Sequence, residues 1–186
     1  MIPLSDTPQR RSSPVITILI IIINVLVYFY SFGKPPGFYD VFIMKYGVIP
    51  FEITTGIDIP PLINYPVYIT LITSLFIHGG FSHIFGNMLF LWIFGDNVED
   101  VLGKIKYLLI YFVGGIGASL CQVAISPSSK IPLVGASGAI SAVMGAYIVL
   151  LPLSSINVIV PFFFFPLLVQ IPALIFIFFW FLTQLF

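Results

Sequence analysis

The sequence predicts an all-α polytopic membrane protein, and three observations carry that prediction. Apolar residues make up 59% of the 186 positions and charged residues only 8%, against about 25% charged in soluble domains. Seven basic and seven acidic side chains are too few to cover a soluble surface of this size. Residues 131–186 contain no charged side chain at all. We therefore expect a lipid bilayer to surround most of the chain.

The chain divides into a short N-terminal segment and a membrane domain. Residues 1–14 are polar and are expected to form a cytoplasmic N-terminus, while residues 15–186 are expected to form the membrane domain. The first apolar run, Val15–Phe32, is long enough to cross a bilayer. It ends without the small-residue cleavage site of a signal peptide and is followed by further apolar runs, so we expect a retained first helix.

Four further apolar regions bring the expected number of spans to five. They are Phe81–Phe94, Tyr107–Ile125, Leu133–Leu151 and a final stretch from Ile156 to Phe186. The final stretch contains three prolines and is expected to be an interfacial lead-in followed by one span. The long loop from Gly33 to Gly80 is also rich in proline. Its apolar segment Val67–His78 is too short to cross, so an interfacial or re-entrant helix is expected there.

Basic residues give the expected orientation. The positive-inside rule places Arg10, Arg11, Lys104 and Lys106 on the cytoplasmic side. The long first loop then lies outside. With this topology the start of the second span and the start of the fourth enter the bilayer from the same outer face.

The sequence argues against nucleic-acid binding, an intrachain disulfide, and a metal or cofactor. A net charge of zero offers no basic surface for nucleic acid. The single cysteine, Cys121, excludes an intrachain disulfide. Two histidines without a nearby carboxylate are a poor metal site, so neither a metal nor a cofactor is expected.

The tetrad Gly135-Ala136-Ser137-Gly138 is the first candidate for chemistry. Its small neighbours leave the serine hydroxyl reachable, and its N–H groups lie near a helix N-terminus, which favours negative charge. The alternative is structural, because small residues at three- and four-residue spacing are typical of tightly packed membrane helices. That stripe comprises Gly135, Ala139, Ser141, Ala142, Gly145 and Ala146.

His83 and Asn87 are the second candidate. They are four residues apart, so a helix places both on one face. Polar groups in a span face a protein interior or a water-filled cavity. The alternative interpretation is structural, with both side chains serving as packing contacts between helices. The predicted topology brings them to the depth of Ser137, where their donors could hold the oxyanion of an acyl-transfer intermediate. His78 precedes His83 by five residues and need not share its face.

These residues resemble the rhomboid intramembrane serine proteases. The resemblance rests on the string from His78 to Leu89, on Gly95 and Glu99, and on the later Gly-Ala-Ser-Gly and Gly145, and it extends from about Tyr46 to the end. It implies a rhomboid-like helical bundle with five of the usual six core helices present. It also implies that Ser137 is the nucleophile and that His83 and Asn87 line the oxyanion hole, with support from His78, Gly135 and Gly138. Glu99 corresponds to a structural acidic position.

The resemblance further implies the reaction and its setting. Rhomboids cleave transmembrane segments of other membrane proteins near the outer face of the bilayer, in a site open to the extracytoplasmic side. Their general base is a histidine on the sixth helix, and His78 and His83 are the only histidines of this sequence. We expect a C-terminally truncated protease. The alternatives are an inactive rhomboid-like protein that binds transmembrane helices and a small channel or transporter component.

Overall fold

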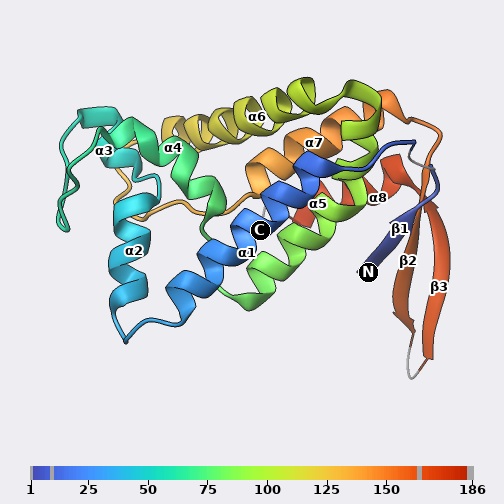
Figure 1. The fold of residues 1–186 in the computed structure, drawn as a ribbon, viewed down its shortest axis with the longest axis horizontal. Helices are drawn as coiled ribbons and strands as arrows, with labels where there is room; N and C mark the ends of the chain where they lie inside the picture. Colours follow the sequence, from blue (N-terminus) through green and yellow to red (C-terminus); the bar gives the residue numbers. More distant parts are fainter. Residues whose placement is uncertain (1, 9–10, 163–164, 184–186) are drawn as a thin grey trace.

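The computed structural model describes residues 2–8, 11–162 and 165–183. Arg10, which entered the orientation argument, and the last three residues of the expected final span lie outside this range. Eight α-helices and three strands are formed within it (Figure 1). The fold is mostly helical, as predicted.

Two helices are long and apolar enough to cross a membrane by themselves. They are α1 (Val15–Phe32) and α6 (Lys104–Ile125). The segment Val67–Phe76 and α5 (Phe81–Leu102) make a third candidate together, bent by 81° at the residues between them. Helices α7 (Ser137–Leu150) and α8 (Ala173–Thr183) are apolar but shorter. The described residues therefore hold two or three candidate spans, and the expected five are not confirmed.

The long first loop contains more helix than its prolines suggested. It forms α2 (Phe38–Tyr46) and α3 (Pro50–Thr55), followed by the short turns η1 (Val67–Ile69), α4 (Thr70–Thr73) and η2 (Ser74–Phe76). Pro50 opens α3, a position where its missing N–H costs nothing. The short turns run into α5 through the sharp bend, which agrees with the expected interfacial or re-entrant segment.

The expectation of an all-α chain is wrong in two places. Strand β1 (Ile2–Asp6) lies in the polar N-terminus, and β2 (Ser155–Phe162) with β3 (Phe165–Pro172) replaces the expected interfacial lead-in. The three form an antiparallel sheet in the order β1-β2-β3. Prolines interrupt a helical ladder here, and Ile156 and Val158 are both buried two residues apart, which is the period of a strand.

Helix α5 is central to the packing. It contacts α1, α6, α7 and β1, and in Figure 1 it runs beside α1. Its acidic end holds the start of α1, because Glu99 accepts hydrogen bonds from the N–H groups of Ile16 (2.9 Å) and Thr17 (2.8 Å) and from the Thr17 hydroxyl (2.9 Å). A carboxylate at a helix N-terminus satisfies unpaired donors and suits the helix dipole. The structure thus gives Glu99 the structural role that the resemblance implied.

Candidate functional site

The segment before Ser137 is fixed by two earlier parts of the chain. Leu133 exchanges backbone hydrogen bonds with Val48 at 2.8 and 3.0 Å. The Gly135 N–H donates to the Ser74 carbonyl at 2.9 Å. These contacts keep residues 131–136 out of the helix, so α7 begins at Ser137 and not at Leu133 as predicted.

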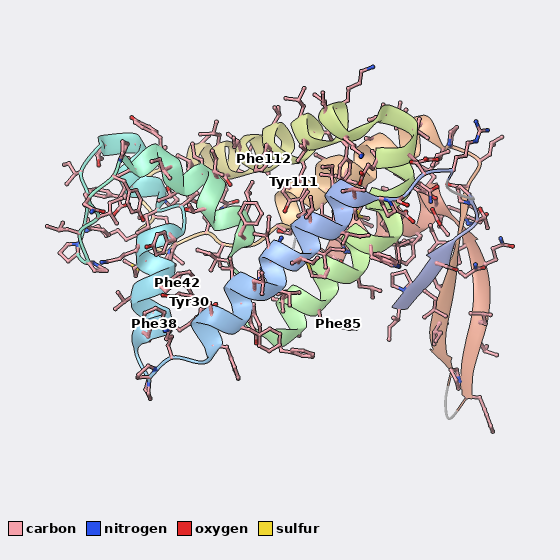
Figure 2. The ribbon with its side chains drawn as sticks, viewed as in Figure 1. Tyr30, Phe38, Phe42, Phe85, Tyr111 and Phe112 are labelled. Carbon is pink, nitrogen blue, oxygen red and sulfur yellow. The ribbon has the colours of Figure 1, made fainter. Side chains whose placement is uncertain are left out.

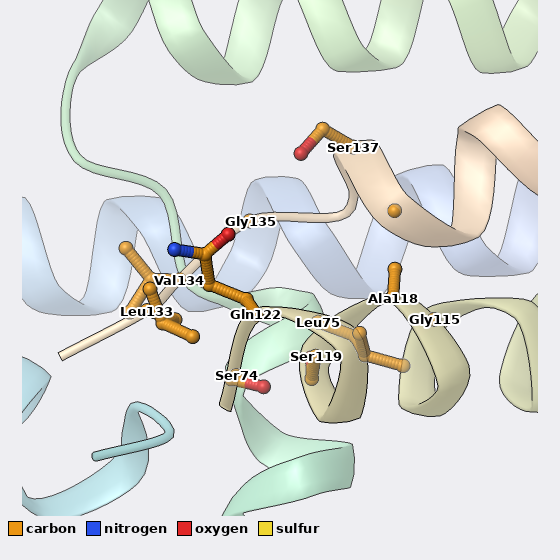
Figure 3. A pocket seen from close by; sticks show the side chains of 11 residues that line it. Ser74, Leu75, Gly115, Ala118, Ser119, Gln122, Leu133, Val134, Gly135 and Ser137 are labelled. Carbon is orange, nitrogen blue, oxygen red and sulfur yellow. The ribbon is translucent and has the colours of Figure 1, made fainter. Parts of the chain in front are cut away.

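Ser137 is the first residue of α7 and is half-buried. It lines a cavity of about 230 Å³ between α6, α7 and the end of the first loop. Figure 3 shows Ser137 at the first turn of α7, with Gln122 of α6 also reaching the cavity. Gly135 and Gly138 line it too. Three of the residues named from sequence therefore share one cavity.

His83 and Asn87 approach the same tetrad from α5. A Cβ added at Gly135 would lie 2.8 Å from His83 Nε2 and 3.7 Å from Asn87 Nδ2. The φ angle of Gly135 is +122°, a conformation that side chains rarely adopt. Gly135 is therefore required both by its φ angle and by the lack of room for a Cβ. Without a side chain at this position, the His83 and Asn87 nitrogens can lie close to the backbone two residues before Ser137.

Both α5 side chains present hydrogen-bond donors. His83 Nδ1 accepts the N–H of Gly79 at 3.2 Å, so in the neutral ring the proton is on Nε2, the atom beside Gly135. Asn87 Nδ2 is buried and has no hydrogen-bond partner within the described residues. A buried amide donor without an acceptor is costly and calls for an explanation. Two donors therefore converge near Gly135 with at least one of them unused.

His78 lies next to these groups, although its spacing did not require it. Its ring is buried and packs edge-on to His83, with centroids 5.1 Å apart and planes at 70°. Its Nε2 accepts the Ala136 N–H in a long contact of 3.5 Å. The Tyr39 hydroxyl of α2 donates to its carbonyl. Burial raises the pKa of Tyr39 above its ordinary value of 10.0, which keeps the hydroxyl a donor. His78 thus links the first loop to the residue before Ser137.

Small residues hold α7 close to α6, as the structural interpretation of the tetrad expected. A Cβ at Gly138 would lie 2.5 Å from Ala118 Cβ, and a Cβ at Gly114 only 2.1 Å from Ala142 Cβ. Gly138 and Ala142 are four residues apart on α7, as are Gly114 and Ala118 on α6, so the two helices pack through facing small residues. Gly145 has open space around its Cα and does not take part. The catalytic and structural interpretations of this stripe are therefore compatible.

Three residues near the site were missed from sequence. Ser74 has a buried hydroxyl without a hydrogen-bond partner in the described part of the chain and lines the cavity. Gln122 lines it as well, and a polar side chain near the end of an apolar run was a usable signal. Tyr39 gave no signal, because aromatic residues are frequent throughout this chain. Among the residues described, no three His, Cys, Asp or Glu side chains are grouped to hold a metal.

Comparison with known proteins gives a consistent family. The family model for the rhomboid domain matches residues 66–186. "Rhomboid-like protein 11, chloroplastic" of Arabidopsis thaliana is 36% identical over 77 residues, 41% of this chain and 27% of that protein. "Rhomboid protease GluP" of Bacillus subtilis is 41% identical over 76 residues, 41% of this chain and 14% of that protein. "Rhomboid protease AarA" of Providencia stuartii is 29% identical over 151 residues, 73% of this chain and 50% of that protein. The chain spans half or less of the length of these relatives.

Proposed function

Because the chain belongs to the rhomboid family of integral membrane proteins, we propose that it is an intramembrane serine endopeptidase that cleaves transmembrane segments of other proteins near the outer face of the bilayer. One observation carries this proposal. His83 Nε2 and the unused Asn87 Nδ2 converge at Gly135, two residues from a serine that lines a cavity. An unpaired buried donor next to a reachable serine is available to a substrate oxygen.

The chemistry assigned to these groups is acyl transfer. Ser137 Oγ attacks the scissile carbonyl, whose oxygen becomes negatively charged. We assign His83 Nε2–H and Asn87 Nδ2–H as donors to that oxygen, and their proximity to Gly135 supports this assignment. The general base takes the Ser137 proton and returns it to the departing nitrogen when the C–N bond breaks, which releases the amine half of the substrate. Water, deprotonated by the same base, then hydrolyses the acyl-enzyme and frees Ser137.

The general base is assigned to neither histidine of this chain. His83 serves the oxyanion, and His78 Nε2 is directed at the Ala136 N–H. Family resemblance assigns the base to a histidine on a sixth helix. The activity is therefore to be measured on the full-length protein that the gene encodes. No metal or cofactor is needed for this reaction.

A serine-directed fluorophosphonate probe tests the assignment. We expect the probe to label the protein and Ser137→Ala to abolish labelling, while Ser128→Ala, which removes an exposed loop hydroxyl, leaves it unchanged. Asn87→Ala should slow cleavage of a transmembrane substrate by about 10²–10³-fold, as expected for one lost oxyanion donor. His78→Ala should be milder. Equal, mild losses in all of these variants would refute the assigned roles.

The same experiment decides the second candidate, an inactive rhomboid-like protein that binds transmembrane helices. The observation that favours it is the commitment of both histidines to other contacts. Its signature is a protein that the probe does not label but that retains a transmembrane peptide in detergent. That result would overturn the protease proposal.

A further inference from the structure

A second cavity is lined in part by Gly79, Gly80 and Phe81, which directly follow His78 in the chain. It has a volume of about 440 Å³ and lies where α1 ends and α5 begins. Phe32 and Phe81, the last residue of α1 and the first of α5, both line it and are 71% and 70% exposed. Since α1 is long enough to cross the membrane, its end marks the boundary between hydrocarbon and headgroups.

The cavity has one charged side chain in its lining, Lys34. Its ammonium lies 4.7 Å from the ring centre of Tyr30 and 5.8 Å from that of Phe38. Figure 2 shows these aromatic residues between α1 and α2. Within the described residues Lys34 forms no ion pair with a carboxylate. The adjacent acidic residue of α2, Asp40, is exposed and does not line the cavity.

A third cavity of about 220 Å³ lies deeper along α1. Ile23 and Val27 of α1 line it, together with side chains of α2 and of the segment 73–77, and none of its lining residues is charged. Ile23 and Val27 precede Phe32 by nine and five residues, which is about 14 and 8 Å along the helix axis. An apolar cavity beside the span and a cationic one at its end match the two parts of an amphiphile.

We propose that this face of the protein binds an anionic phospholipid, with the headgroup phosphate at Lys34 and an acyl chain along α1 toward the deeper cavity. Lys34 is the charged side chain in the lining of the cavity, and no carboxylate in the lining offsets its positive charge. An anionic headgroup should therefore bind more tightly than a zwitterionic one. The lipid would touch Gly79, whose N–H donates to His83 Nδ1. It would also touch Tyr39, whose hydroxyl donates to the His78 carbonyl. The binding itself does not depend on any proteolytic activity.

Native mass spectrometry of the purified protein tests this proposal. The protein is given an equimolar mixture of dioleoyl phosphatidylglycerol and dioleoyl phosphatidylcholine, which differ only in the headgroup. We expect the bound fraction to favour phosphatidylglycerol by about five-fold, the preference that one lysine near the membrane surface provides. Lys34→Gln should remove the preference and Lys34→Arg should keep it.

Lys45→Gln is the matched control, because Lys45 lies on the same loop and does not line the cavity. It should leave the preference unchanged. An equal loss in both glutamine variants, or no loss in Lys34→Gln, would overturn the proposal in favour of diffuse charge attraction. Glycerol 1-phosphate, which carries the headgroup charge without tails, should not displace the bound lipid. Displacement would overturn the role of the apolar cavity.

Discussion

The contact between α6 and α7 allows a quantitative test by exchanging one methyl group across it. Gly114→Ala places a Cβ 2.1 Å from Ala142 Cβ, whereas carbon atoms in contact lie about 3.5–4.0 Å apart. The helices must separate by more than an ångström, and overpacking of this kind costs about 1–3 kcal/mol. Alanine gains about 1 kcal/mol over glycine in a helix. Because the clash is severe, we take the overpacking cost as about 3 kcal/mol. After subtraction of the gain in helix propensity, Gly114→Ala should lower the free energy of unfolding by about 2 kcal/mol.

The reciprocal change supplies the control. Ala142→Gly alone should cost about 1 kcal/mol in helix propensity. In the double variant the two propensity changes cancel and the clash disappears, so its stability should return to that of the wild type. The resulting coupling of about 3 kcal/mol is characteristic of residues in direct contact. Gly145→Ala, with nothing within 4 Å of the added Cβ, should be stabilising by up to about 1 kcal/mol.

Unfolding by SDS in mixed micelles, followed by tryptophan fluorescence, measures these free energies. The chain has two tryptophans to report the transition. Two results would refute the reasoning: a Gly114→Ala variant as stable as the wild type, or a double variant as unstable as Gly114→Ala. Either would mean that α6 and α7 are not held together at this contact.

Three further predictions use other parts of the structure. Glu99→Gln removes the charge that holds the start of α1 and should cost about 2 kcal/mol in the same titration. Asp100→Asn should cost less, because Asp100 is only partly buried and its partners, the Arg11 N–H and the Ser12 hydroxyl, precede the helix. Gly135→Ala forces a side chain into a φ of +122° and against His83, so probe labelling should slow at least ten-fold. Burial raises the pKa of Glu52 above its ordinary 4.5, so ionisation destabilises the folded state. The thermal midpoint should fall as the pH rises from 4.5 through the raised pKa and then level off, and in Glu52→Gln this part of the fall should be absent.

The spans were the most predictable part of the fold. The first helix has the predicted bounds, Val15–Phe32, and α6 begins only three residues before the predicted Tyr107. Long apolar runs specify such helices because lipid leaves the backbone no other way to satisfy its hydrogen bonds. The sheet was not predictable in this way, since β2 finds its partner β1 far away in sequence and the alternation of polar and apolar residues in β2 is limited to residues 155–158.

The candidate site was predictable in its members more than in its arrangement. The spacing of His83 and Asn87 correctly placed both on one helix, and the tetrad marked the start of another. Which ring nitrogen carries the proton depends on the N–H of Gly79, a backbone group that no residue type reveals. The placement of His78 beside Ala136 depends equally on the sharp bend before α5.

The pairing of β1 with β2 also constrains how the chain threads the bilayer. Ile2 pairs with Ile159, so the segment before α1 and the segment after α7 lie on one side of the membrane. A chain that leaves a side and returns to it crosses an even number of times. With α1, α5 and α6 as three crossings, parity requires a fourth. We therefore expect α7 to cross despite its 14 residues, about 21 Å of helix, in a bilayer locally thinned around Ser137.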